Sequence, residues 1–367
     1  MRKMKSPDQI CSTGSHVPNQ ASKLQNKSEF SGSIMEKLMD FTSSVPDFRR
    51  PDKGNIRHRM SDIIMLMILG RASGHVVRSE IIEFGRHNLN RFRKMGMLMN
   101  GVPSEATLCR IEQGIDDLSM ADRMREFAQT YHDRLLMDNS GKEIICVNGK
   151  AERGTVLKNG SSPDIVSAYS PATGITLATE ACQEKSKEIK AVPRLIDKID
   201  KIRTHTPTHS YTEGTELAHG RIETRTYRIH DGLDMIADKE KWGGGMIVVE
   251  YESDTIFKSN GKHTNEKRLY VTSLPANTPL LGAIVRSHWA IESMHWGLDV
   301  NLNQDRIKRR SGKSARNLDT IQRIVYSVFS IWKRLRKKRD DRKKGMAEIM
   351  RLVSASFTKL IRFLCQK

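Results

Sequence analysis

The chain has 367 residues and a formal net charge of +19, with 62 lysines and arginines against 43 acidic residues. Its length argues against a single domain, because one hydrophobic core rarely serves more than about 250–300 residues. The hydrophobic fraction of 37% argues against a disordered chain, and the charge predicts a polyanionic partner, with nucleic acid ahead of an anionic membrane.

The apolar and cysteine patterns argue against two further classes. The longest apolar run, at residues 63–69, has seven residues and is too short to cross a bilayer, so we expect a buried helix there and no membrane partner. No apolar segment follows the basic N-terminus, and the five cysteines lack CxxC spacing. We therefore expect a cytoplasmic protein without a zinc module.

The N-terminal third has helical periodicity after a polar start. Residues 1–28 have no apolar period and are predicted to be a disordered lead-in. Residues 29–140 are predicted to form a helical domain. Within it we expect helices at 33–41, at 62–74 with Ser61 as N-cap, at 79–95, and at 105–115 with Ser104 as N-cap.

From about residue 141 the period changes to that of strands. We expect strands at 142–148, 164–170 and 174–182, with the last two joined as a hairpin by "PAT", and then a helix at 187–199. Residues 200–220 show no clear element. Antiparallel strands of a second sheet are expected in "RIETRTYRIH", "GMIVVEYESDTIF" and "KRLYVTSLP", and helices from residue 278 onward. The fold class is therefore mixed α/β.

Asn148 is the polar residue at which the first expected strand stops, ahead of a glycine turn. "VNGK" with "ERGT" suits a phosphate held beside a metal, but taken alone these residues favour an ordinary loop that contains a lysine and an arginine. Basic residues recur at 185–189, at 219–225 and at 333–344. Each of these segments could contact DNA or form a solvated surface.

A helix over "RSHWAIESMHWGLD" would place several functional residue types on one side. His288, Glu292, His295 and Asp299 have the spacing of metal ligands on a helical face. The simpler interpretation is that the tryptophans belong to the core and the polar residues to a solvated edge.

These segments in series resemble the insertion-sequence transposases of the DDE type, in particular the H-repeat-associated group. The matching pieces span about residues 45–325. They are "SVPDFRRPDKGNIRHRMSDIIMLMILG", "FGRHNLNRF", "GVPSEATLCRI", "VNGKAERGT", "VSAYSPATGITLA", "KSKEIKAVPRLIDKID", "HGRIETRTY" and "VRSHWAIESMHWGLDVNLNQDRIKR".

The resemblance implies a ribonuclease-H-like core at residues 141–305, with a β-rich insertion at about 219–275 and basic C-terminal helices at 306–367. In the family, two aspartates and a glutamate hold two Mg²⁺ or Mn²⁺ ions. The first aspartate falls on Asn148 and the glutamate, a metal ligand, on Glu292. The implied DNA-contacting residues are Lys150, Arg153, Lys185, Arg221, Arg225, Arg286, Arg306, Lys308 and Arg309.

The second aspartate has no counterpart. "DKID" at 197–200 leads directly into a segment that resembles the region beyond it, so a strand, a helix and a strand, about 25–60 residues, are expected to be deleted. Two further departures are Lys187, where the family usually has Asn, and His288 and Asp299, where the wider superfamily often has Arg and Lys. The first strand would become a sheet edge, which predicts marginal stability or aggregation of residues 141–305.

We therefore expect a catalytically inactive transposase relative, and the resemblance implies that its helical domain at 29–140 binds DNA. The resemblance implies a homodimer on the terminal inverted repeats of the element and a cytoplasmic, nucleoid-associated location in a prokaryote. One alternative is a DNA-binding regulator of an intact transposase. A second is retained catalysis through Glu292, Asp299 and Asp164, and a third is a relic that is not translated or is promptly degraded.

Overall fold

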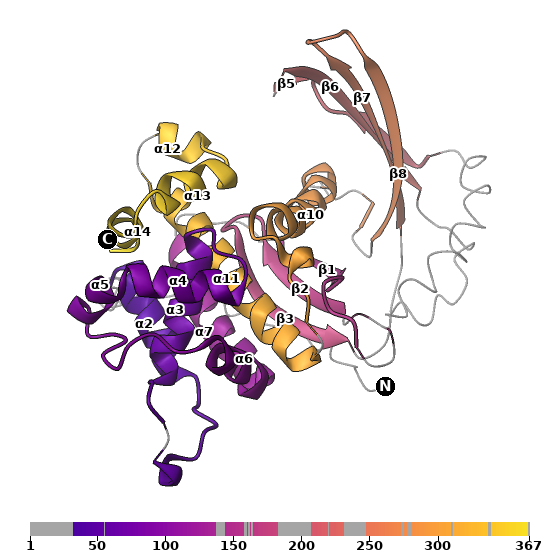
Figure 1. The fold of residues 1–367 in the computed structure, drawn as a ribbon. Helices are drawn as coiled ribbons and strands as arrows, with labels where there is room; N and C mark the ends of the chain where they lie inside the picture. The colour runs from indigo at the N-terminus through magenta and orange to yellow at the C-terminus, as the bar shows by residue number, and fades with distance from the viewer. Residues whose placement is uncertain are drawn as a thin grey trace, which may run out of the picture.

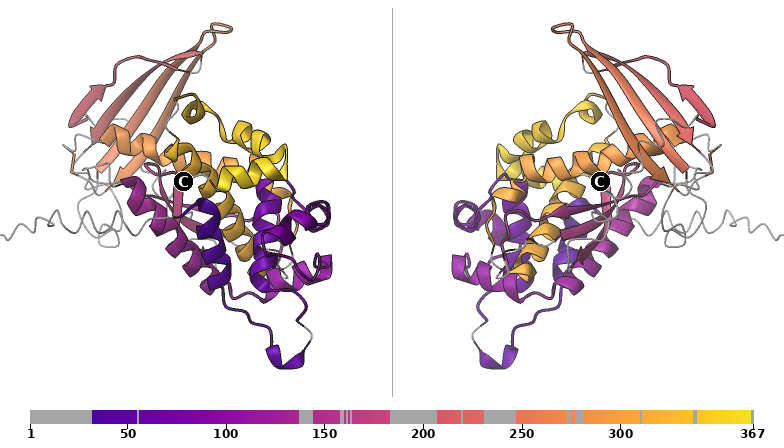
Figure 2. Two further views of the ribbon diagram at one scale, coloured as in Figure 1. Left: turned by 90° about the vertical axis from the view of Figure 1, so that its left-hand side faces the viewer. Right: turned by 90° about the vertical axis from the view of Figure 1, so that its right-hand side faces the viewer.

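The computed structural model describes residues 32–136, 144–182, 207–230, 247–276, 281–336 and 339–365, apart from positions 55, 158, 159, 161, 163, 219, 273, 274 and 310. Helices from both ends of the chain pack together beside a small antiparallel sheet, and a second antiparallel sheet stands away from them (Figures 1 and 2). The architecture is thus mixed α/β, as expected. The predicted helix at 187–199 and the lead-in at 1–28 lie outside the described residues.

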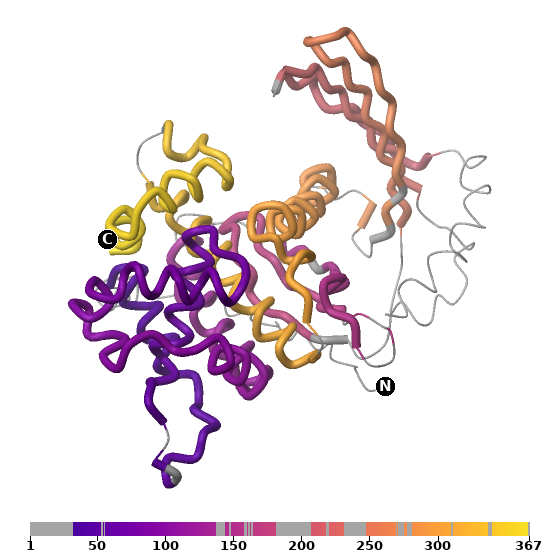
Figure 3. Tube along the Cα trace, in the orientation of Figure 1, coloured from indigo at the N-terminus to yellow at the C-terminus, as the bar shows by residue number. Residues whose placement is uncertain are grey.

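The N-terminal part is helical. Its elements are α2 (Ile34–Ser44), η1 (Pro51–Lys53), α3 (Met60–Ala72), α4 (Arg78–His87), α5 (Leu89–Lys94), α6 (Glu105–Gly114) and α7 (Asp117–Leu136). Between α2 and α3 the chain makes a long excursion away from the helices (Figure 3). The hydroxyl of Ser104 accepts from the Thr107 amide, which confirms the predicted N-cap of α6.

The predicted cap of α3 is wrong. The helix begins at Met60 and its N-cap is Arg59, so Ser61 lies inside the first turn. Met60 is buried in the core, and the helix starts two residues earlier than predicted. Asp62 then occupies the first turn, where its carboxylate accepts from the Leu98 amide at 2.9 Å. The apolar run at 63–69 is buried in α3, as expected.

The first sheet has the order β1-β2-β3 and is antiparallel throughout. It consists of β1 (Cys146–Ala151), β2 (Asp164–Ser170) and β3 (Ile175–Cys182). The hairpin between β2 and β3 is confirmed. β1, however, does not stop at Asn148, because Asn148 pairs with Ser167 and the ladder continues to Ala151.

The second sheet has the order β4-β6-β7-β8, with β5 paired to β6. Its long strands β6 (Arg221–His230), β7 (Ile247–Phe257) and β8 (His263–Thr272) confirm the predicted antiparallel strands. Two short strands, β4 (His209–Thr212) and β5 (Glu216–Ala218), lie in the segment where no element was expected. All four residues of β4 are exposed, so this strand has no alternation of apolar and polar residues by which the sequence could reveal it.

The C-terminal part is helical, as expected. It comprises α10 (Leu281–Asn301), η3 (Gln304–Arg306), α11 (Gly312–Leu335), α12 (Arg339–Lys343), α13 (Met346–Ser354) and α14 (Phe357–Leu364). None of the helices in the described part of the chain is long and apolar enough to cross a membrane.

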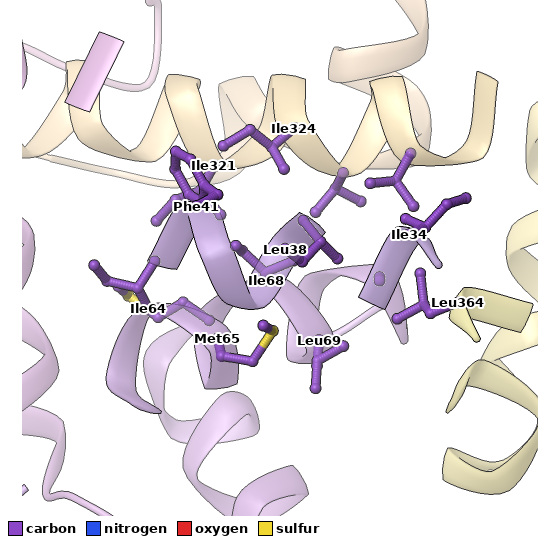
Figure 4. Close-up of a cluster of buried hydrophobic side chains, with 14 of the residues drawn as sticks. Ile34, Leu38, Phe41, Ile64, Met65, Ile68, Leu69, Ile321, Ile324 and Leu364 are labelled. Atoms are coloured by element: carbon purple, nitrogen blue, oxygen red, sulfur yellow. The ribbon is translucent and has the colours of Figure 1, made fainter. Parts of the chain in front are cut away.

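One core joins the two ends of the chain. The buried side chains of α2, α3 and α7 form a single cluster with those of α11, α13 and α14. Figure 4 shows Ile321 and Ile324 of α11 lying over Phe41, Leu38 and Ile68. α11 is therefore an internal helix rather than part of a peripheral tail.

A smaller core holds the second sheet against the N-terminal half of α10. Tyr227, Tyr251 and Val285 are among its buried members, and Trp289 donates from Nε1 to the Tyr270 hydroxyl at 2.8 Å. Trp296, two turns later, is 62% exposed. The expectation that the tryptophans of this helix belong to the core thus holds for Trp289 and fails for Trp296. α10 bridges the two sheets.

Candidate functional site

Asn148 lies in the middle of β1, on a strand face that packs against α10. Cys146 and Lys150 share this face through the two-residue period of a strand. Both reach α10, since the Cys146 thiol donates to the Ser287 carbonyl at 3.0 Å and the Lys150 ammonium lies 2.8 Å from Asp299. Asn148, between these two contacts, is half-buried.

Glu292 also lies on α10, where it meets the second sheet. Its carboxylate is 3.9 Å from Arg268 on β8 and 3.9 Å from His288 one turn earlier, and its side chain is 47% exposed. Asn148 and Glu292, the two positions singled out by the resemblance, thus come from elements that pack together.

The stripe of metal-ligand spacing on α10 does not converge on one point. Burial, together with the charges of Arg323 and Lys150, lowers the pKa of His295 to about 3, so its imidazole stays neutral. Asp299, one turn further, is engaged by Lys150. Within the described ranges, no group of three or more His, Cys, Asp or Glu is placed to hold a metal ion.

Lys150 is the central cation of this region. Its buried ammonium lies 2.8 Å from Asp299 and 3.1 Å from Asp305 of η3. Burial lowers the pKa of Lys150, but Glu152, Asp299 and Asp305 outweigh it and raise that pKa above its ordinary value. The charge is therefore fixed inside the protein.

A buried polar network continues from β1 to α11. Gln304 donates from Nε2 to Glu152 at 3.0 Å and to Asp319 at 2.8 Å, and Arg323 binds both oxygens of Asp319. Burial and the nearby Asp319 raise the pKa of Glu152 to about 8. The sequence analysis missed this network. Its only signal was the i,i+4 spacing of Asp319 and Arg323, which is common on exposed helices.

The turn after β1 docks onto the segment after η3. Arg309 donates its amide to the Gly154 carbonyl at 3.0 Å and accepts from the Val156 amide at 3.3 Å, and Thr155 forms a parallel bridge with Arg309. A Cβ on Gly154 would lie 2.6 Å from the Ile307 carbonyl oxygen. Only glycine lets "ERGT" and "DRIKR" approach this closely.

Arg309 also reaches a fully buried carboxylate in the helical part. Glu112 of α6 lies 2.6 Å from Arg78, 3.3 Å from Arg309 and 3.7 Å from Arg71, and Ser314 donates to it at 3.4 Å. Three arginines thus surround one carboxylate where the N-terminal and C-terminal helices meet.

Other arginines expected at DNA are held by acidic partners in the second sheet. Arg225 lies 2.7 Å from Glu216 and 2.8 Å from Glu223. Arg286 pairs with Glu213, and Arg221 lies 3.7 Å from Glu223.

The remaining residues that were predicted to contact DNA are more exposed to solvent. Arg153, in the turn after β1, and Arg306 and Lys308, after α10, are exposed. These residues come from the two segments that dock through Gly154, so they belong to one region of the surface. Lys185 lies outside the described residues.

Comparisons with known proteins identify relatives for most of the chain. A family model described as DDE_Tnp_1-associated matches residues 39–128. "Putative transposase YncI" of Escherichia coli O157:H7 is 26% identical, covering 80% of this chain and 87% of the relative. "H repeat-associated putative transposase YhhI" of Escherichia coli K12 is 24% identical over 81% of this chain and 91% of the relative. "Inactive transposase YbfQ", from the same strain, is 34% identical over 89% of its own length and 21% of this chain. The chain belongs to the DDE transposase family.

Within this transposase-family chain, the matched segment 39–128 runs from α2 into α7. It contains the loop between α2 and α3, Glu112 and the buried helix α3, but none of the residues around Lys150. The family model therefore bears on the helical part alone, whereas the relatives YncI and YhhI match about 80% of the chain.

Proposed function

We propose that this DDE transposase relative binds DNA and does not cleave it. The observation that carries the proposal is Asn148, an amide on β1 at the position where the family has a metal-binding carboxylate. Lys150, two residues further on the same strand face, fills its surroundings with a positive charge. The name of the relative YbfQ, an inactive transposase, is consistent with loss of activity in this group.

The side chains in this region do not fit a pair of divalent ions. Such ions need several negatively charged oxygen ligands, and an amide oxygen supplies none of that charge. Glu292 is turned toward Arg268 and His288. Asp299 and Asp305 already neutralise Lys150, whose ammonium would repel a metal ion. We therefore propose no metal-dependent step for this chain.

We infer that β1, β2, β3 and α10 are what remains of a ribonuclease-H-like core, with the second sheet as its insertion. Two observations support this inference. β1 ends the strand order in the described part of the first sheet, where the family would place further strands. The match to YncI runs over 348 positions but uses 80% of this chain, which leaves roughly fifty positions of the relative without a counterpart, about the size of a strand, a helix and a strand.

The DNA contacts that we propose follow the exposed cations. Arg153, Arg306 and Lys308 lie together beside the Gly154 turn and can meet phosphates, whereas Lys150 and Arg309 are buried in ion pairs. We propose that the helices at 29–140 form a second DNA-binding part. We also propose that the chain assembles as a homodimer on the paired ends of the element. The setting is the bacterial cytoplasm, where the element's terminal repeats lie.

A second candidate function is regulation of an intact transposase. The match of a DDE_Tnp_1-associated family model to residues 39–128 favours it, because the structure describes helices along that segment. Binding without cleavage would let this chain occupy the element's ends. Specific binding to those ends distinguishes a regulator from a chain that only follows the DNA backbone.

The test uses the full-length protein and labelled DNA from the flanks of its own gene, with and without Mn²⁺, on one gel. We expect a retarded band and no cleavage for the natural chain. Asn148→Asp should also fail to cleave, because a single restored carboxylate does not rebuild a two-metal site.

The control is Glu292→Gln, which should bind DNA as the natural chain does. Metal-dependent cleavage at the element's end that is abolished in Glu292→Gln would overturn the proposal and favour catalysis through Glu292, Asp299 and Asp164. Absence of any retarded band would refute the DNA-binding part.

A further inference from the structure

A cleft lies at the end of α11 that is far from the Glu152 network. This cleft of about 780 Å³ opens between α7, the β2–β3 turn, the end of α11 and the helices that follow it. Its polar lining includes Tyr169, Tyr326, Ser330, Lys333, Arg334 and Arg342. Asp319 and Ser330 are eleven residues apart on α11, which places this cleft about 16 Å from the Glu152 network along the helix axis.

The charge of the cleft has one sign. Arg134, Lys333, Arg334 and Arg342 line it, and none of the lining residues that the structure describes is acidic. Lys333 and Arg334 form no ion pair within the described part of the chain. Partial burial and the neighbouring Arg334 lower the pKa of Lys333, as expected for a cation whose charge is not compensated.

Contacts between the β2–β3 turn and α11 fix the wall of this cleft. Arg334 donates from Nη2 to the Pro171 carbonyl at 2.7 Å, which fixes the β2–β3 turn against the end of α11. Gly174 in that turn has a φ of +72°, and a Cβ there would lie 3.0 Å from Ser330 Cβ. Asp341 of α12 lies 2.6 Å from Lys344 and 3.4 Å from Arg336.

These features specify the chemistry of a ligand. A volume of this size suits a group much larger than a water molecule. Several cations with tyrosine and serine hydroxyls beside them match the oxygens of phosphate, for which arginine is a bidentate donor. A carboxylate ligand would satisfy fewer of these donors.

We propose that this cleft binds phosphate groups, either of a DNA strand that passes beyond the Asn148 region or of a free oligophosphate. Lys333, Arg334 and Arg342 supply the charge, and the tyrosine hydroxyls supply neutral donors. The phosphate site is independent of the proposed DNA binding. Only its occupation by a DNA strand rests on the proposed function.

The experiment compares the natural full-length chain with Lys333→Gln/Arg342→Gln. The matched control, Lys359→Gln/Arg362→Gln, removes the same charge from exposed positions of α14. Two quantities are measured: the rise in Tm caused by tripolyphosphate, and the slope of log Kd for a labelled duplex against log salt concentration.

If a free oligophosphate is the occupant, tripolyphosphate raises Tm in the natural chain and the control but not in the cleft variant. If DNA is the occupant, the salt slope of the cleft variant falls by about 1.8, at about 0.9 per lost phosphate contact, and that of the control falls by less. A rise in Tm with tripolyphosphate in a chain that binds no DNA would support the phosphate site and refute the proposed function. If the cleft variant and the control variant show the same rise in Tm and the same salt slope, the proposal of a phosphate site is wrong.

Discussion

Single buried charges determine much of what this molecule can and cannot do. Lys150, Glu152 and Glu112 are all buried, and each is surrounded by charged side chains from distant parts of the sequence. Sequence analysis found Lys150 through its motif. It could not find Glu112 or Glu152, because their roles depend on partners about 150 to 200 positions away.

Glu112→Gln should destabilise the protein by about 3–5 kcal/mol, because it leaves three arginines at a buried site without their counter-charge. Urea unfolding of the full chain measures this change. Glu83→Gln, which breaks an exposed pair with Arg86, serves as control and should change stability by less than about 1 kcal/mol. Equal effects of the two substitutions would show that the arginines do not need Glu112.

Glu152 makes stability depend on pH in a defined direction. Its pKa is raised to about 8 in the folded chain from an ordinary value of 4.5, so the folded state keeps a proton that the unfolded state loses. Its contribution is fully present below about pH 4.5 and is lost as pH rises through about 8.

Glu152→Gln should therefore match the natural chain near pH 5 and exceed its stability near pH 9. The measurement is the free energy of unfolding across that range. Glu348→Gln, at an exposed position on α13, should follow the natural chain throughout. A difference between Glu152→Gln and the natural chain that stays constant with pH would contradict the raised pKa.

At the scale of elements, periodicity predicted most of the long helices and strands, and packing decided the rest. β2 and β7 were predicted because each buries alternate residues over much of its length. β1 runs past Asn148 because its ladder with β2 continues through Lys150, whose buried side chain looks, in sequence, like the end of a strand. The exposed strand β4 carries no apolar alternation at all.

Gly154→Ala should loosen the contact between the β1 turn and the segment after η3, because its Cβ would meet the backbone carbonyl of Ile307. We expect a loss of about 1–3 kcal/mol, measured by urea unfolding. Gly149→Ala, on β1 itself, is the matched control, since its Cβ would be 3.8 Å from Val166, an ordinary contact. Similar stabilities for both variants would mean that the turn can move away at little cost.

In the part of the first sheet that the structure describes, β1 is an edge strand, and the prediction of marginal stability depends on this position. Lys150 points inward from this edge, which is one of the ways in which proteins discourage strand addition. Ile145, just before the strand, is 40% exposed and acts in the opposite direction. A sharp, cooperative thermal melt of the purified chain, without aggregation, would contradict the prediction.

At the scale of the whole molecule, the shared core was beyond the sequence analysis. The expected boundaries at 140 and 306 follow changes of periodicity, which show what each segment forms but not what it packs against. α11 buries almost its whole length among α3, α6 and α7. The candidate site was predictable only as two positions, Asn148 and Glu292, because the resemblance named them.

A fragment of residues 32–136 should therefore fail to melt cooperatively, because the faces of α3 and α7 that α11 covers would be exposed to water. Circular dichroism during heating measures this. Addition of a peptide of residues 311–336 should restore helicity and a melting transition, and a scrambled peptide should not. A cooperative melt of the fragment alone would show that the helices fold without α11.

The position of α11 also bears on the order in which the ribosome produces this chain. The last residue of α7 leaves the ribosome some 176 positions before the first residue of α11. At about 5–20 residues per second, the N-terminal helices wait on the order of 10 to 40 seconds for the helix that covers them. During that interval the apolar surface of α3 is available to chaperones and proteases, so cellular levels of this protein depend on how quickly translation reaches its end.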